Sequence, residues 1–324
     1  MKFFRALAAL TLVSGFASLS PAAATKYHFI KDIPIGGKAQ WDYLCVEPES
    51  QRLFVSHGTK VEVIDLAKGS VIGQIDDTPG VHGIALAPQL GRAFVSNGKE
   101  NTASVVDLKS LKTLMKVATG ANPDAILFEP VQNEVYTFNG KGKSSTVFDA
   151  QSGKVVATID LSGKPEFATT DGKGRLYVNL EDKSQVGVID SKARKLINKW
   201  PIAPGEAASG MAIDLAKHRL FLGCDNKKMV KLDIISGKVV ASVPIGAGVD
   251  ACAFDPGTSL AFSSNGEEGT TTIATAENPD KLIVVQTLKT VVGARTMTVD
   301  PKTHYIYLPA PTPAFRVLVY GPEQ

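Results

Sequence analysis

The segment Arg52-Leu-Phe-Val-Ser-His57 is the first of seven versions of one short phrase that recurs along the chain. Each version places an aromatic residue among β-branched or other apolar neighbours. Later versions begin at Arg92, Glu134, Arg175, Arg219, Leu260 and Tyr305. The central aromatics are Phe54, Phe94, Tyr136, Tyr177, Phe221, Phe262 and Tyr307, spaced 40 to 45 residues apart. A steady period of this length indicates a repeat architecture in which each repeat forms one small structural unit.

The third repeat shows what that unit contains. Short apolar runs at 125–128, 135–138, 145–148 and 154–159 are separated by turn residues, and Gly153 suits the positive φ of a tight hairpin. No segment has a long helical period, which excludes helical repeats. Four antiparallel strands per repeat, seven times over, predict an all-β fold: a seven-bladed β-propeller of four-stranded blades.

The two ends of the repeat array complement each other. The last repeat runs out at Tyr320 with only three strands, while an extra strand, 27–35, precedes the first complete repeat. We therefore expect the N-terminal strand to join the C-terminal blade and close the ring, which removes an exposed sheet edge. Residues 25–324 are then a single propeller domain.

The first 24 residues have the pattern of an export signal. Lys2 and Arg5 precede an apolar run from Ala6 to Leu19, and Ala22-Ala23-Ala24 provides small residues for cleavage after Ala24. The run is interrupted and shorter than the ~20 residues that span a bilayer, which argues against a membrane anchor. The sequence predicts a cleaved signal peptide at 1–24 and a periplasmic or secreted protein without a membrane span.

Composition restricts the class of function. The 324 residues are 44% hydrophobic and 21% charged, which is typical of a globular protein. The net charge of +3 falls to +1 once Lys2 and Arg5 are removed, which argues against a nucleic-acid partner. With only three cysteines and no Cys-x-x-Cys, covalent haem and a zinc ribbon are not expected. Cys224 and Cys252 could be bridged, although two free thiols are the preferred interpretation.

Several phrases resemble the YVTN-repeat family of exported bacterial seven-bladed propellers, the YncE-like proteins. They are Leu53-Phe-Val-Ser56, Phe94-Val-Ser-Asn-Gly98, Val61-Glu-Val-Ile-Asp65, Val186-Gly-Val-Ile-Asp190 and Ser152-Gly-Lys-Val-Val-Ala-Thr-Ile159. The resemblance covers the whole chain after residue 24 and implies the fold and export, but no particular activity. The sixth repeat departs from the pattern at 270–280. WD40-type and quinone-cofactor propellers are not supported, because only Trp41 and Trp200 are tryptophans and only Trp41 precedes Asp.

The loops most suited to chemistry are those that meet around the axis of the ring. In a four-stranded blade, the loop before the first strand and the loop after the second open on the same end. Counting back six positions from Pro48 and its equivalents gives one residue per blade. These mouth residues are Asp42, His82, Asp124, Glu166, Ser209, Asp250 and Arg295. The loops after the second strands add His57, Asn97, Asn139, Asn179, Glu181, Asp182, Asp225, Asn226, Asn265 and Glu267.

Two interpretations of these residues remain open. Carboxylates and imidazoles from different loops suit a divalent cation or a polar ligand, for which we select Asp42, His57, His82, Asp124, Glu166, Asp250 and Arg295. Asp and Asn also serve turns, and Asn-Gly at 97–98, 139–140 and 265–266 is common turn chemistry. Asp65, Asp107, Asp149, Asp190 and Asp233 each end a third strand at the opposite end, and we interpret them as turn caps.

Two hypotheses for function follow. The first is a ligand- or protein-binding module that uses the funnel face, most simply as a monomer, with a small molecule or a periplasmic protein as partner. The second is a lactonase-like hydrolase, in which a cation at the mouth polarises a carbonyl while a carboxylate, His57 or His82 moves the proton. The sequence holds no catalytic triad, phosphate-binding glycine loop or His-Glu-x-x-His motif. The resemblance and the missing motifs favour the binding module.

Overall fold

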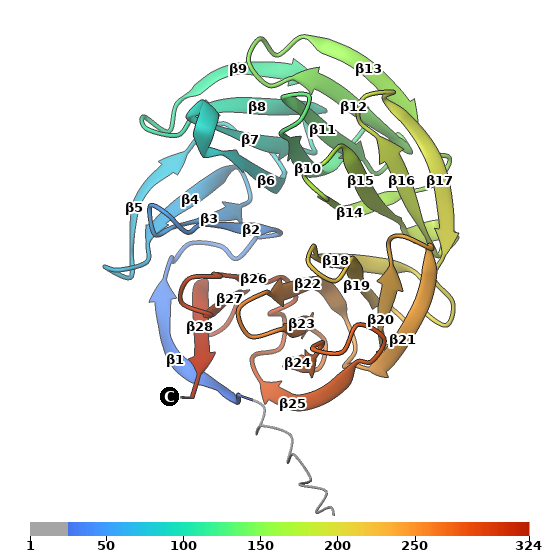
Figure 1. Cartoon of the computed structure of the whole chain (residues 1–324). Coiled ribbons are helices and arrows are strands. Elements are labelled where there is room, and N and C mark those ends of the chain that lie inside the picture. The colour runs from blue at the N-terminus through green and yellow to red at the C-terminus, as the bar shows by residue number, and fades with distance from the viewer. Residues whose placement is uncertain (1–24, 324) are drawn as a thin grey trace, which may run out of the picture.

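The computed structural model describes residues 25–323 and contains seven four-stranded antiparallel sheets arranged in a ring (Figure 1). This confirms the predicted all-β seven-bladed propeller. The predicted signal peptide, residues 1–24, lies outside the described residues. Within residues 25–323, no helix is long and apolar enough to cross a bilayer.

The strands follow the repeats in order, and the first strand of each blade lies nearest the axis (Figure 1). Blade one contains β2 (Leu44–Glu47), β3 (Arg52–His57), β4 (Lys60–Asp65) and β5 (Ser70–Ile75). Blade two contains β6 (Val81–Ala87), β7 (Arg92–Asn97), β8 (Thr102–Asp107) and β9 (Thr113–Ala118), with the short 3₁₀ helix η1 (Pro88–Leu90). Blade three contains β10 (Pro123–Glu129), β11 (Glu134–Asn139), β12 (Ser144–Asp149) and β13 (Val155–Asp160). Blade four contains β14 (Pro165–Thr170), β15 (Arg175–Leu180), β16 (Gln185–Asp190) and β17 (Lys195–Pro201), with η2 (Glu181–Lys183).

The remaining three blades continue this order. Blade five contains β18 (Ala208–Asp214), β19 (Arg219–Cys224), β20 (Lys228–Asp233) and β21 (Lys238–Pro244). Blade six contains β22 (Val249–Asp255), β23 (Leu260–Asn265), β24 (Thr270–Thr275) and β25 (Ile283–Lys289). Blade seven contains β26 (Thr298–Val299), β27 (Ile306–Ala310), β28 (Arg316–Pro322) and, from the N-terminus, β1 (Tyr27–Pro34).

The recurring aromatic residue packs between neighbouring blades. Phe94 of blade two lies 6.1 Å, centroid to centroid, from both Phe128 and Phe148 of blade three. Phe221 of blade five stacks on Phe254 of blade six at 5.1 Å. Because each blade buries its aromatic against the next, the core is divided among the interfaces between blades. The strict repeat period in the sequence therefore reflects the repeated interface.

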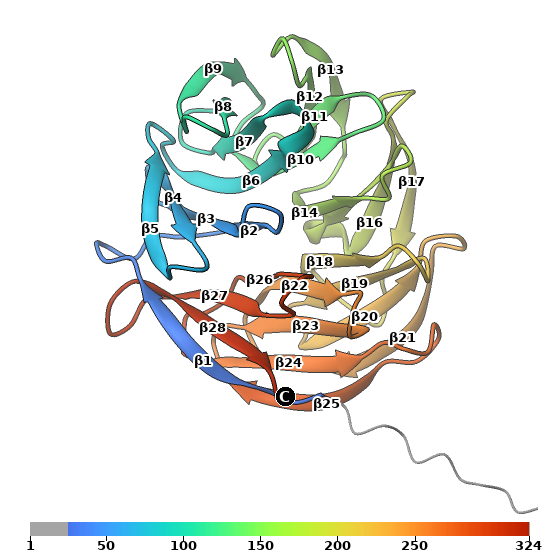
Figure 2. The ribbon, with the colours of Figure 1, turned by 60° about the vertical axis from the view of Figure 1, so that its left-hand side comes forward.

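The N-terminal strand completes the last sheet. β1 pairs antiparallel with β28 from Tyr27 opposite Pro322 to Pro34 opposite Arg316 (Figure 2). Tyr27 and Ile33 are buried, and the other residues of β1 are more exposed. That the ring depends on this strand for its stability remains a prediction.

Two large aromatic side chains meet near the axis of the ring. Tyr43 follows the mouth residue Asp42, Phe167 follows Glu166, and their rings meet edge to face at 5.2 Å. The equivalent residues of the other blades are smaller, and they are Gly83, Ala125, Gly210, Ala251 and Thr296. An axial cavity of about 240 Å³ is lined by both aromatics and by the inner strands of other blades. The small residues leave room for this aromatic pair, which forms a floor beneath the mouth.

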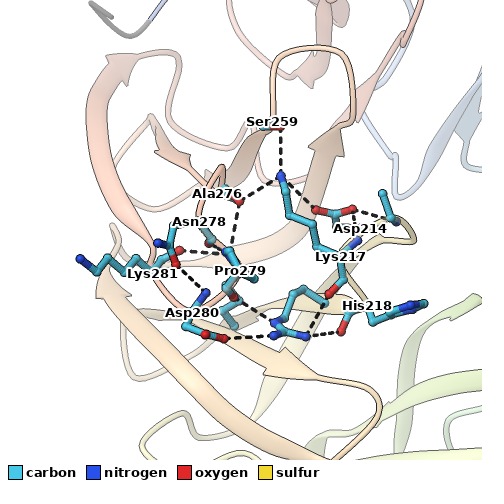
Figure 3. A network of polar contacts seen from close by, with 12 residues as sticks. Asp214, Lys217, His218, Ser259, Ala276, Asn278, Pro279, Asp280 and Lys281 are labelled. Atoms are coloured by element: carbon cyan, nitrogen blue, oxygen red, sulfur yellow. Dashed lines mark hydrogen bonds and ion pairs between the residues drawn. The ribbon is translucent and has the colours of Figure 1, made fainter. Parts of the chain in front are cut away.

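Lysine side chains of blade five hydrogen bond to the irregular part of the sixth repeat. The loop between β24 and β25 covers Lys231, whose side chain is fully buried. Its Nζ donates hydrogen bonds to the carbonyl oxygens of Ala276, Asn278 and Lys281 at 3.4, 2.6 and 3.0 Å. Figure 3 shows the surrounding network, in which Lys217 contacts Ser259, Ala276 and Asp214. β24 and β25 still pair as an antiparallel hairpin, and the carbonyl groups of the loop between them are bound by Lys231 and Lys217.

The aspartates at the ends of the third strands act as turn caps, as predicted. Asp65 Oδ1 accepts a hydrogen bond from the Lys68 backbone nitrogen at 2.9 Å, and Asp149 Oδ1 accepts one from Ser152 at 2.7 Å. Asp107, Asp190 and Asp233 accept equivalent bonds. Cys45, Cys224 and Cys252 are all free thiols.

Candidate functional site

The seven mouth residues occupy equivalent places at the start of the inner strands. Asp42 lies two residues before β2 and Arg295 three residues before β26, and the others are the second residues of β6, β10, β14, β18 and β22. The counting rule applied to the sequence therefore selected the same structural position in every blade. What distinguishes the residues is the partner that each side chain finds.

Asp42, His82 and Asp124, from three consecutive blades, form the central cluster of the mouth. One potential ligand atom of each residue lies within 4.8 Å of the other two. His82 Nδ1 lies 2.5 Å from Asp42 Oδ2 and 3.9 Å from Asp124 Oδ1. We call these three residues the Asp-His-Asp cluster.

Hydroxyl groups of the second strands position the backbone of this cluster. Ser56 Oγ accepts a hydrogen bond from the Asp42 backbone nitrogen at 2.7 Å. Ser96 Oγ accepts one from the Gly83 nitrogen at 2.7 Å and donates to the Asp124 carbonyl at 2.5 Å. Ser56 and Ser96 occupy the same place in the repeated phrase, two residues after its aromatic. This recurrence was a signal in the sequence for residues that support the mouth, and it was missed there.

The other charged mouth residues have partners of their own. Arg295 Nε lies 3.1 Å from Asp250 Oδ2, and Arg295 Nη2 donates to the Trp41 carbonyl at 3.0 Å. Glu166 pairs with Lys164 at 2.6 Å. Arg295 therefore lies beside the residue that precedes Asp42, as expected for neighbouring blades one and seven. The structure brings six of the seven selected residues to the mouth, with positive charge beside Asp250 and Glu166.

Several carboxyl groups of the mouth are buried close to one another, and this raises their pKa values. Burial, followed by the neighbouring Asp42 carboxylate, raises the pKa of Asp124 to about 8. Burial and Asp42 also raise the pKa of Asp250 to about 7, and burial raises that of Glu166. Burial opposes the charged form of His82, but its hydrogen bond to Asp42 and the nearby carboxylates raise its pKa overall. The cluster therefore holds protons that a bound cation could replace.

These pKa values predict that the free energy of unfolding falls as pH rises from 4 to 8. In this range the folded protein keeps the Asp124 proton, whereas the unfolded chain, with an ordinary pKa of 3.8, has released it. Each such carboxyl contributes a slope of up to ~1.4 kcal/mol per pH unit. Urea unfolding without added metal, at pH 5, 6, 7 and 8, should show a steeper fall for the parent than for Asp124→Asn.

The matched control is Glu49→Gln, which changes an exposed carboxylate in the turn between β2 and β3, at the end of blade one opposite the mouth. It should keep the slope of the parent. Identical slopes for the parent and Asp124→Asn would show that the Asp124 pKa is not raised.

His57 does not join the cluster. Its Nδ1 lies 2.8 Å from Glu62 Oε1, its Nε2 lies 3.0 Å from the Lys38 carbonyl oxygen, and its ring lies 4.7 Å from that of Phe315. Both ring nitrogens are thus engaged within the blade and its neighbouring loop. His57 therefore lies apart from the Asp-His-Asp cluster, and its expected role in ligand binding stays a prediction.

The asparagines of the Asn-Gly turns also have structural partners. The buried amide of Asn97 donates to the hydroxyls of Thr102 and Ser104 at 3.0 and 2.9 Å. Asn139 and Asn265 make the same pair of bonds to hydroxyls five and seven residues later. Asn179 instead donates to the carbonyls of Ser209 and Gly210 in the next blade. The three asparagines of the Asn-Gly sites thus have structural partners, but these are hydroxyls of the next strand and not the backbone of the turn.

The comparisons with known proteins agree with this fold. No family model matches the chain. A protein of Salmonella typhimurium, described as uncharacterized protein YncE, is 29% identical over 148 residues, which span 44% of this chain and 42% of that protein. The YncE of Salmonella typhi is 28% identical over the same length. The chain thus matches less than half of the length of these relatives.

Solved structures share the fold at low sequence identity. Kuenenia stuttgartiensis hydrazine synthase has a TM-score of 0.71 and 16% identity, covering 84% of this chain and 94% of that one. The RRP9 WD40 repeats have a TM-score of 0.81 and 10% identity, covering 91% and 98%. The chain is by its fold a seven-bladed β-propeller. The fold and the similarity to YncE together support the interpretation of this chain as a YncE-like β-propeller.

Proposed function

We propose that the protein is an exported binding module that takes a divalent cation, and with it a polar small molecule or a periplasmic protein, at the mouth of the propeller. The observation that carries this proposal is the Asp-His-Asp cluster, in which one ligand atom of each residue lies within 4.8 Å of the others. The resemblance to exported propellers and the predicted signal peptide support the location.

The donor set suits a cation in both geometry and charge. Two carboxylates and one imidazole match the ligands preferred by Mn²⁺ and Zn²⁺, and the carboxylates match those of Ca²⁺. A cation between Asp42 and Asp124 would offset both the burial and the repulsion from Asp42 that raise the Asp124 pKa. The aromatic floor of Tyr43 and Phe167 lies beneath, so a ligand would approach from the open end of the mouth.

The proposal predicts cation binding that weakens below about pH 8. Asp124 must release a proton whose pKa is about 8, and His82 must give up its Nδ1 proton if that nitrogen coordinates. The threshold thus lies above the pH of about 6.5 that histidine protonation alone would give. Isothermal titration with Ca²⁺, Zn²⁺ and Mn²⁺ at pH 8 and pH 6 should show up to ~tenfold weaker binding per pH unit.

Variants locate the binding site. Asp124→Asn and His82→Gln should each weaken the preferred cation by at least ~tenfold, equivalent to ~1.4 kcal/mol. Glu49→Gln should bind as the parent does. No heat with any of the three cations at pH 8, or equal binding by parent and Asp124→Asn, would contradict the proposal.

A metal-assisted hydrolase is the second candidate. The specific observation in its favour is that His82 Nδ1 lies 3.9 Å from Asp124 Oδ1, a carboxyl group with a pKa of about 8, because proton transfer is most effective near the working pH. Lactone hydrolysis should then occur with the cation bound, stop after chelation and be lost in Asp124→Asn. Cation binding without any lactone turnover would exclude the hydrolase and leave the binding module as the remaining hypothesis.

A further inference from the structure

A second concave site lies between blades four and five, at the end of the blades opposite the mouth. It is a groove of about 480 Å³, lined by β15, β16, β17 and the β14–β15 turn of blade four and by two turns of blade five. We propose that this far-side groove binds a small apolar carboxylate. The proposal is independent of the cation site, because the groove shares no residue with the mouth.

The groove has an aromatic wall. Trp200 stacks on Tyr177 with their centroids 5.9 Å apart and their planes inclined by 29°. Gly237, with φ of +69°, lies so close that a Cβ there would fall 2.4 Å from Trp200 Nε1. The backbone of the β20–β21 turn therefore holds the indole in place, and this close approach requires glycine.

The rim of the groove is unusually apolar for a surface. Ile197, Leu215 and Ile235 come from three separate segments and are 46%, 51% and 74% exposed. Single exposed aliphatic residues are common, but their convergence around one hollow indicates a binding surface. The volume falls within the range of ~300–1,000 Å³ that is typical of small-molecule sites.

The polar groups of the groove favour an anion. Lys173, Arg175 and His218 supply cationic or donor groups, and the exposed Lys173 and His218 side chains have no ion-pair partner among residues 25–323. The one lining carboxylate, Asp171, accepts hydrogen bonds from the backbone nitrogens of Lys173 and Arg175 at 2.7 and 3.0 Å. Arg175 itself pairs with Asp190 at 2.8 Å.

Trp200 contributes a partly exposed aromatic surface to the groove. An apolar ligand body against Trp200 and Ile197, with a carboxylate toward Lys173 and His218, would use both features of the groove. This complementarity selects an aryl or branched aliphatic carboxylate over a neutral or cationic ligand.

The test uses the small number of tryptophans. In a Trp41→Phe background Trp200 is the only tryptophan, so its emission reports on this groove. Titration with 4-phenylbutanoate to about 5 mM should give a saturable change in emission, and 4-phenylbutanamide should bind at least ~fivefold more weakly. Calorimetry on the parent gives a second readout that does not depend on fluorescence.

Two exposed positions provide a matched pair of variants. Leu215 and Val131 are both 51% exposed in the first turn of their blades, but only Leu215 lines the groove. Leu215→Asp should weaken 4-phenylbutanoate binding by at least ~fivefold, whereas Val131→Asp should leave it unchanged. Cation binding at the mouth should be the same in both variants, which separates this test from that of the proposed function.

Several results would overturn the inference. They are the absence of a saturable signal, equal affinity for the amide, and equal affinity of Leu215→Asp and Val131→Asp. Concentration-dependent dimerisation that Leu215→Asp abolishes, measured by sedimentation, would also overturn it, because the groove would then be an interface between two copies of the chain.

Discussion

A chain that begins at Ile35, without β1, is expected to lose cooperative unfolding. β1 contacts three blades at once. It pairs with β28 of blade seven, Ile33 packs in a cluster with Leu44 and Val46 of blade one, and Tyr27 meets Phe262 of blade six at 5.2 Å. Burial of Tyr27 and Ile33 contributes ~2–3 kcal/mol each before any hydrogen bond is counted. This is a large part of the ~5–15 kcal/mol that stabilises a typical domain.

Polar contacts extend the role of this strand. Gln286 of β25 hydrogen bonds with both the nitrogen and the carbonyl oxygen of Tyr27, at 2.7 and 2.8 Å, and the Tyr27 hydroxyl donates to the His304 carbonyl at 2.8 Å. Deleting β1 breaks all of these bonds and exposes the edge of β28. Circular dichroism and calorimetry should show a broad transition or none.

The control for the deletion is His28→Ala, which changes an exposed residue of the same strand. It should unfold cooperatively with a free energy within ~0.5 kcal/mol of the parent. A truncated chain that melts as sharply as the parent, within a few degrees, would show that the ring does not need β1.

Replacing Lys231 is expected to have the next largest effect. Lys231→Met retains much of the aliphatic stem, which packs in the core, but removes the amine that serves three backbone carbonyls of the blade-six loop. It also removes a cation 5.6 Å from the centre of the Phe221 ring. Leaving buried carbonyls without a donor should cost about 3 kcal/mol of the free energy of unfolding, measured in urea at pH 7.

The Lys231 effect has its own pH dependence. Burial, and then repulsion from Arg219 and Lys217, lowers the pKa of Lys231 from 10.5 to about 8. The folded protein therefore loses this proton before the unfolded chain does, and the stability of the parent relative to Lys231→Met should grow between pH 8 and 10.5. Lys238→Met, at an exposed lysine, is the control. Equal stability of the two variants would contradict a structural role for the buried amine.

The sequence predicted the blades well because a repeat period is a property of the chain itself. The third repeat was expected to hold strands at 125–128, 135–138, 145–148 and 154–159, and the observed strands differ by one or two residues at their ends. The position of each mouth residue also followed from the period, since equivalent places in equivalent blades meet at one end of the ring. Both predictions rest on backbone geometry that all repeats share.

The side-chain partners could not be predicted in the same way. His57 and His82 both appeared suited to the mouth, but His57 binds Glu62 and Lys38 because its strand turns it toward them. His304 Nδ1 lies 2.7 Å from the buried Asp255, a pair that the repeat pattern did not indicate. Such pairs depend on the rotamer and on the neighbouring blade, which a repeat pattern does not specify.

Contacts across the ring were also beyond sequence reasoning. Tyr43 and Phe167 belong to blades one and four, and only the closed ring brings them together at 5.2 Å. Lys231 finds its carbonyls in the irregular stretch of the sixth repeat, where the pattern gave least information. The far-side groove likewise arises from turns of two blades that no single repeat contains.

The most direct test of the account is to locate a cation in a crystal of the protein. Crystals soaked in Mn²⁺ at pH 8 should show an anomalous difference peak between Asp42, His82 and Asp124, with ligand atoms at roughly 2.0–2.4 Å. Crystals of Asp124→Asn, soaked in the same way, should lack that peak. Anomalous peaks only at turn carboxylates such as Asp65 or Asp149, with none at the mouth, would contradict the assignment of the Asp-His-Asp cluster as a cation site.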